Sequence, residues 1–171
     1  MTNAMMCNIP DSTFGSGLRS VKNTSGTIRY GSQGVRFYDL TNNLAYGWLE
    51  GADNSNYGII FGTGNTTESL DDYAPESKVA HSSAFAYDAN IRLSTTYSSL
   101  SKTYNTVISR IANNISSGTL DIKELCFIMN CGAVSGNQNL MFARKVIDTI
   151  SVANGESIQG ILDITSMELP A

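Results

Sequence analysis

Short runs of β-branched and aromatic residues, each bounded by turn-forming residues, constrain this chain more than any other feature. Three such runs fill its C-terminal third, at 119–128, 140–152 and 157–169. Apolar residues in the first run fall mostly on alternate positions, as expected for a strand with one buried face. Between the last two runs, Asn154-Gly155 is the strongest short hairpin signal in the chain. A spacing of about ten residues between strands predicts a β-sandwich or barrel.

Residues 97–114 fit two kinds of element. Tyr104, Val107 and Ile111 have the spacing of one helix face. However, β-branched residues are frequent here, and the segment ends in Asn113-Asn114, as a strand would. We therefore predict a strand.

The composition also disfavours helices. Ser, Thr, Asn and Gly occupy 67 of the 171 positions, and only 15% of the residues are charged. These four residue types are poor helix formers. With 42% apolar residues, a chain of this length can build the core of one domain. The predicted fold is all-β, an antiparallel β-sandwich.

The first 26 residues are predicted to be an extended N-terminal arm. They contain Pro10 and several Gly and Ser residues, with 18–23 as a candidate edge strand. Residues 27–171 then form the single sandwich domain.

The charge distribution argues against two classes of partner. The net charge is −4, and the 11 Lys and Arg residues form no basic cluster, so direct binding of nucleic acid is not expected. No apolar run approaches the roughly 20 residues of a membrane helix. The first residues lack the basic and apolar regions of a signal peptide, which indicates synthesis in a cytoplasm.

Three cysteines, Cys7, Cys126 and Cys131, cannot all pair within one chain. Cys126 and Cys131 are near enough in sequence to meet in space, but we expect buried free thiols.

Glu124 breaks the alternation of its strand. It has the parity of the apolar residues Ile122 and Cys126, so a regular strand would point its carboxylate into the core. One solution is a β-bulge near Lys123-Glu124, which would turn Glu124 outward and bring Leu125 and Phe127 inward. The other is a buried ion pair between Glu124 and Arg144, on the facing candidate strand.

The residues that usually carry catalysis or bind metals are sparse. The one histidine, His81, has no nucleophile motif beside it and is expected at a strand end or on the surface. Ser99–Lys102 matches Ser-x-x-Lys without its companion motifs. The glycine-rich segment 62–67 lacks the lysine and the helix of a phosphate loop. Asp53, Asp71 and Asp72 are expected to be solvated loop carboxylates. We predict no enzymatic activity, no catalytic or metal-binding residues and no cofactor.

Aromatic residues gather between residues 30 and 57. Four of them, Tyr30, Tyr38, Tyr46 and Trp48, are candidates for a protein interface. A row of exposed aromatic side chains on a flat sheet would be a sugar-binding or protein-docking face, so a carbohydrate-binding β-sandwich is an alternative.

Four segments beyond residue 57 resemble, in the same order, virion structural proteins of tailed bacteriophages. The matching segments are Gly62-Thr63-Gly64 leading to Asp72-Tyr73 and Glu76, then Ile122-Lys123-Glu124, then Leu140-Met141-Phe142-Ala143-Arg144, and finally the turn around Asn154-Gly155-Glu156-Ser157. The resemblance covers roughly residues 57–169.

This resemblance implies a non-enzymatic building block of the virion, such as a ring, collar, neck, tail or head-fibre-associated protein. Its partners would be other virion proteins and further copies of itself in a homo-oligomer. It would be made in the cytoplasm of a bacterial host and end up in the virion. An N-terminal arm that orders against a neighbouring subunit suits such a role.

Overall fold

The structure, a computed structural model, describes residues 19–31, 51–100, 103–131 and 138–167. These residues form strands and connections, with no helix among them. The strands are β1 Arg19–Lys22, β2 Ile28–Gly31, β3 Gly58–Gly62, β4 Phe85–Tyr87, β5 Ile91–Ser98, β6 Thr103–Asn114, β7 Leu120–Cys131, β8 Gln138–Val152 and β9 Ser157–Met167.

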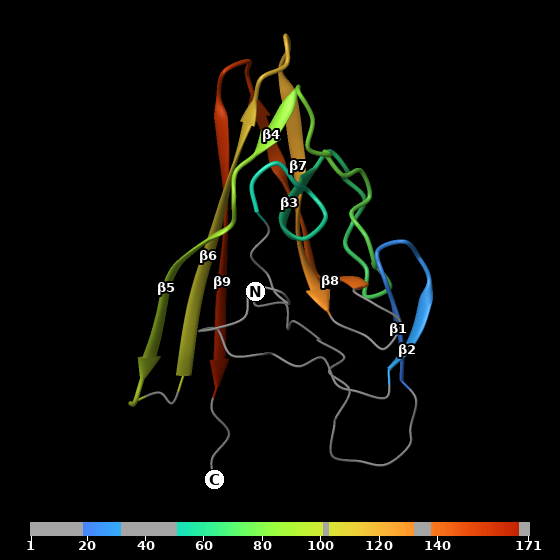
Figure 1. Cartoon of the computed structure of the whole chain (residues 1–171), viewed down its shortest axis with the longest axis vertical. Coiled ribbons are helices and arrows are strands. Elements are labelled where there is room, and N and C mark those ends of the chain that lie inside the picture. The colour runs from blue at the N-terminus through green and yellow to red at the C-terminus, as the bar shows by residue number, and fades with distance from the viewer. Residues whose placement is uncertain (1–18, 32–50, 101–102, 132–137, 168–171) are drawn as a thin grey trace.

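Two antiparallel sheets pack face to face (Figure 1), which confirms the predicted all-β sandwich. One sheet has the order β3-β7-β8. In the other, β9 pairs along β6, while β5 and β4 pair with the two ends of β6 on its opposite side. A separate sheet contains the pair β1-β2.

The ambiguous segment 97–114 contains the strand β6, as predicted. Buried and less buried residues alternate along it, with Ile108 and Ala112 in the core. Val107 and Ile111 lie on the opposite face, so the helical spacing does not correspond to one buried side.

The core between the sheets centres on an aromatic group. Phe61 of β3 stacks on Tyr87 of β4 with ring centroids 5.8 Å apart, and Phe85 meets both rings edge-on. The Tyr87 hydroxyl donates to the carbonyl oxygen of Val79 at 2.8 Å and accepts from the main-chain N–H of Phe61 at 3.0 Å. Burial raises the pKa of Tyr87 above its ordinary value, so the hydroxyl keeps its proton.

Arg110 of β6 is buried in this core, and sequence reading assigned it no role. Its side chain is 1% exposed and lies over the Tyr87 ring, with the guanidinium carbon 4.5 Å from the centroid. The guanidinium donates to main-chain carbonyls of the segment preceding β3, of β3 itself and of the residue after β4. These acceptors are Gly51, Asn54, Tyr57, Ile59 and Asp88.

The predicted boundary after residue 26 falls within the β1-β2 hairpin. Asn23 forms its turn by accepting, through Oδ1, the main-chain N–H groups of Ser25 and Thr27. The hairpin attaches to the start of β8 through Thr24 N–H, which donates to the carbonyl of Asn139 at 2.9 Å. Residues 19–26 of the predicted arm therefore belong to a hairpin bound to the sandwich, and residues 1–18 lie outside the described part.

The turn at Asn154-Gly155 is present, but the predicted hairpin is wrong. β8 pairs with β7, and β9 pairs with β6, so the turn carries the chain from one sheet to the other. Gly155 has φ +79°, whereas Asn154 is not among the residues with positive φ. The two-residue hairpin favoured by Asn-Gly needs positive φ at both positions, so this turn does not align the strands as a pair.

At Gly160 of β9 the two sheets lie close together. A Cβ at this position would lie 2.7 Å from Ile59 Cγ2 and 3.1 Å from Leu125 Cδ1. We expect Gly160→Ala to lower the free energy of unfolding by about 1–3 kcal/mol through overpacking, measured by urea denaturation. Gly118→Ala is the matched control, because a Cβ there meets nothing within 4 Å. Equal stability of the two variants would contradict this close packing.

Candidate functional site

A β-bulge in β7 decides which way Glu124 points. The pairing of β7 with β8 shifts register between Ile122 and Glu124. Ile122 lies in the core between the sheets, and beyond the bulge Leu125 and Phe127 face that core. Glu124 is thereby turned to the opposite face, with Cys126. The bulge is present as predicted, and it brings Leu125 and Phe127 inward as predicted.

Glu124 is nevertheless fully buried, with 0% of its surface exposed. The connection 63–77 between β3 and β4 covers this face of the sheet, because its main chain bonds to the Glu124 carboxylate. The expectation that a bulge would expose Glu124 is therefore wrong. The β-bulge and the buried ion pair, which the sequence offered as alternatives, therefore occur together, since the Glu124 carboxylate is also paired with Arg144.

Arg144 of β8 lies diagonally across from Glu124, and its Nε donates to Glu124 Oε2 at 2.8 Å. The predicted ion pair is thus present. The Arg144 side chain is only 3% exposed. A pair this deeply buried needs good hydrogen-bond geometry to offset the loss of hydration.

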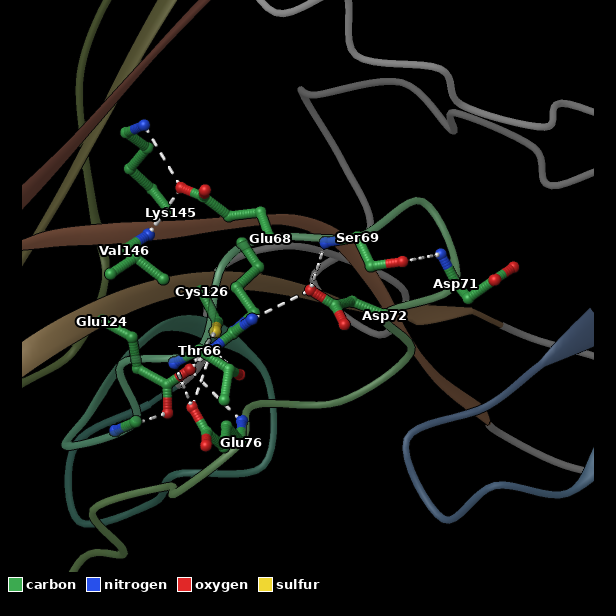
Figure 2. Close-up of polar contacts among 12 residues, drawn as sticks. Thr66, Glu68, Ser69, Asp71, Asp72, Glu76, Glu124, Cys126, Lys145 and Val146 are labelled. Atoms are coloured by element: carbon green, nitrogen blue, oxygen red, sulfur yellow. Dashed lines mark hydrogen bonds and ion pairs between the residues drawn. The ribbon is translucent and has the colours of Figure 1, made fainter.

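The other two guanidinium nitrogens of Arg144 bind carboxylates from the covering connection. Nη1 donates to Asp72 Oδ2 at 2.9 Å, and Nη2 donates to Glu76 Oε2 at 3.1 Å. Figure 2 shows Asp72, Glu76 and Glu124 gathered in one place. We call Arg144 with these three carboxylates the Arg144 cluster.

Glu124 also holds the main chain of the connection directly. Its Oε1 accepts the N–H of Ser77 at 2.8 Å and that of Gly64 at 3.3 Å, and its Oε2 accepts the N–H of Glu76 at 3.2 Å. A Cβ on Gly62 would lie 2.2 Å from Glu124 Oε1, and one on Gly64 would lie 2.8 Å from it. The Gly-Thr-Gly sequence therefore makes room for a carboxylate of the same chain.

The electrostatics of the cluster keep Arg144 charged and the neighbouring Cys126 thiol protonated. Burial lowers the pKa of Arg144, but hydrogen bonds to Glu124 and Asp72 outweigh this and leave it above the ordinary value. Burial, together with the Glu124 charge, raises the pKa of the Cys126 thiol. Cys126 is a free buried cysteine, as predicted, and stays protonated, so it is not a nucleophile.

A second attachment joins the connection to the outer edge of β8. The main-chain N–H of Val146 donates to Glu68 Oε1 at 2.8 Å, and Lys145 Nζ lies 3.2 Å from the same oxygen. Asp72 Oδ2 also accepts the N–H of Ser69 at 3.0 Å, which closes the turn between these attachments (Figure 2).

Asp72 corrects the expectation for the loop carboxylates, because it is bound to Arg144 instead of being simply solvated. Asp71 is exposed, and Asp53 is exposed with its Oδ1 3.8 Å from His81 Nε2. Sequence reading missed Asp72 and Glu76 as partners of Arg144. The only signal for them was their place in the segments that carry the family resemblance.

His81 has a structural environment at the end of the aromatic core. Its ring Nδ1 accepts the main-chain N–H of Tyr87 at 3.3 Å. The main-chain N–H of His81 donates to Ser55 Oγ at 3.0 Å. Ser99 is exposed, and Lys102 lies outside the described residues.

The candidate interface aromatics stay a prediction. Tyr38, Tyr46 and Trp48 lie outside the described residues; Tyr30 is in β2, but its side chain is not described. Cys7 also lies outside the described residues, and the side chain of Cys131 in β7 is not described.

No known protein family, characterised protein or solved structure matches this chain. Among the residues that the structure describes, no group of three or more His, Cys, Asp or Glu side chains is arranged to hold a metal ion. In that same part of the chain, no helix is long and apolar enough to cross a membrane.

We expect Arg144→Met to lower the free energy of unfolding by about 3–5 kcal/mol, because it leaves the buried Glu124 carboxylate without its cation. Lys145→Met is the matched control. Its amine is paired only at the surface, with the side chain 66% exposed, so the loss should stay below about 1 kcal/mol. Urea denaturation measures both. A double-mutant cycle with Glu124→Gln should be strongly non-additive; additive losses would contradict the contact.

Acid should loosen the connection 63–77. The N–H of Val146 lowers the pKa of Glu68, and the N–H of Thr66 lowers that of Glu76, each from an ordinary value of 4.5. A lowered pKa in the folded state stabilises the fold above about pH 4.5, and this contribution is lost as the pH falls through the folded-state values.

We therefore expect the urea midpoint to fall as the pH is lowered below about 4.5. The double variant Glu68→Gln/Glu76→Gln should show a shallower fall than the parent chain. An unchanged slope would show that these carboxylates do not couple the connection to pH.

Proposed function

We propose that this chain is a non-enzymatic structural component of a tailed-phage virion that acts through protein–protein assembly. A ring, collar, neck, tail or head-fibre-associated position fits this proposal. The protein would be made in the cytoplasm of a bacterial host, and its partners would be other virion proteins and further copies of itself.

The observation that carries the proposal is the convergence of the resembling segments. Gly62 and Gly64, Asp72 and Glu76, Glu124 and Arg144 come from three segments of the sequence, and all of them meet in or around the Arg144 cluster. Proteins that share a fold are expected to keep the residues that form one buried contact network, and the resembling segments supply such residues here. This convergence supports a shared fold more directly than a shared reaction.

The chemistry of the Arg144 cluster supports a framework role as well. Each nitrogen of the guanidinium donates to a carboxylate, and Glu124 accepts three main-chain N–H groups. Groups engaged in this way hold a connection in place and are not poised to bind a substrate.

The low charge content suits repeated interfaces. Only 15% of the residues are charged, and the outward-facing positions of β9 include Ser157, Gln159 and Thr165. Covering uncharged small side chains with another protein avoids the cost of removing water from charges.

The proposal is tested by the solution mass of the purified protein, measured by light scattering. The full chain should form a discrete homo-oligomer, and removal of residues 1–18 should reduce its mass without changing its circular dichroism spectrum. The deletion stops at residue 18 because residues 19–26 belong to the β1-β2 hairpin.

A monomer in both forms would contradict the assembly role. The alternative, a carbohydrate-binding module that uses Tyr30, Tyr38, Tyr46 and Trp48, would then be tested on a glycan array, with Trp48→Ala as the variant that should lose binding.

A further inference from the structure

The two sheets end in edge strands, and several of these edges are covered by other parts of the chain. The outer edge of β8 is engaged by Glu68 at Val146 and by Thr24 N–H at the carbonyl of Asn139. The outer edge of β3 is engaged by residues 77–79, with Val79 N–H donating to the carbonyl of Phe61. Covered edges do not pair with another chain.

Edge strand β5 is protected differently. Its pairing with β6 shifts register between Arg92 and Ser94, which marks a β-bulge. A bulge interrupts the regular row of main-chain groups that a new strand would need.

Strand β9 has neither form of protection among the residues described. It pairs with β6 in unbroken register, from Ser157 opposite Asn113 to Met167 opposite Thr103. Within the described part of the chain, no strand pairs with its other edge. Its sequence contains one charged residue, Asp163, and no Pro or Lys. A long, regular edge of this kind is a template for another strand.

We propose that a second copy of this chain pairs with β9 in antiparallel fashion, around a two-fold axis through Ile161. This inference rests on the proposed assembly role and names one of its contacts. Residues 157–165 of one copy would then lie opposite the same residues of the second copy in reverse order. The two four-stranded sheets would join into one continuous sheet across the axis.

The sequence of β9 is self-complementary in this register. Ile161, which is 53% exposed, would lie opposite Ile161 of the second copy. Asp163 would face Gln159, and on the inner face the half-buried Leu162 would face Gly160, which has no side chain. A two-fold axis through Asp163 would instead place two carboxylates directly opposite each other, which is unfavourable.

Cysteine cross-linking in the full-length protein tests both the contact and its register. Directly opposite residues in antiparallel strands have Cα atoms about 4.5–5.5 Å apart, within the range of a disulfide. Ile161→Cys should therefore give a covalent dimer on mild oxidation, seen on a non-reducing gel. The parent chain, which carries Cys7, Cys126 and Cys131, sets the background.

Ser157→Cys and Thr165→Cys are matched controls, because both positions are exposed on the same face of β9. Neither variant should cross-link alone, since equivalent cysteines would be about 27 Å apart across the axis. An equimolar mixture of the two should cross-link, because residue 157 lies opposite residue 165. Cross-linking of either control alone, or none in the mixture, would overturn this register.

The mass of Ile161→Lys completes the test. Two lysines facing each other across the axis repel, so this variant should lose the β9 contact while its circular dichroism spectrum stays unchanged. An oligomer that persists in Ile161→Lys, together with no covalent dimer of Ile161→Cys, would overturn β9 pairing and leave the assembly role intact. Cross-links as expected, with a mass that does not depend on residues 1–18, would support β9 pairing and contradict only the role of the arm.

Discussion

The sandwich depends on one guanidinium group that binds three carboxylates. Arg144 projects from β8 and joins Glu124 of the neighbouring strand to Asp72 and Glu76 of the connection 63–77. Because the Glu124 carboxylate also accepts main-chain N–H groups of the same connection, this polar segment is fixed against the face of the sheet. Without this segment, the buried Glu124 carboxylate would lose the three main-chain N–H groups that it accepts.

A second buried arginine, Arg110, organises the core between the sheets in a different way. Arg110 donates to main-chain carbonyls around β3 and after β4, whereas Arg144 donates mainly to carboxylates. Both use the planar fork of donors that only arginine provides. In a chain with so few charged residues, two cations are thus placed where they hold connections to the sheets.

The sequence predicted the all-β fold and the irregularity at Glu124, because both leave local signals. Apolar residues alternate along the strands, and Glu124 is a charged residue at a position where this alternation expects an apolar one. The bulge and the contact with Arg144 followed as alternatives, and both proved to be present. Partners from distant segments were not predictable in the same way. Nothing near Asp72 or Glu76 indicates that they bind Arg144, and nothing near Arg110 indicates which carbonyls it meets. The hairpin predicted at Asn154-Gly155 was wrong for a related reason. The two strands that flank this turn pair with β7 and β6, which are distant in sequence, and not with each other.

The same contacts that build the fold also determine which edge is left for a partner. Glu68 bonds to the edge of β8 because the Arg144 cluster holds the connection beside it. Residues 77–79, where that connection ends and the chain continues, bond to the edge of β3. The connection lies against the β3-β7-β8 sheet, so its contacts do not reach β9. Parts of both edges of one sheet are thereby engaged, while β9 of the other sheet keeps a regular edge among the described residues. This asymmetry suits the proposed assembly role, because one defined edge gives a closed two-fold contact, whereas several open edges would allow uncontrolled association.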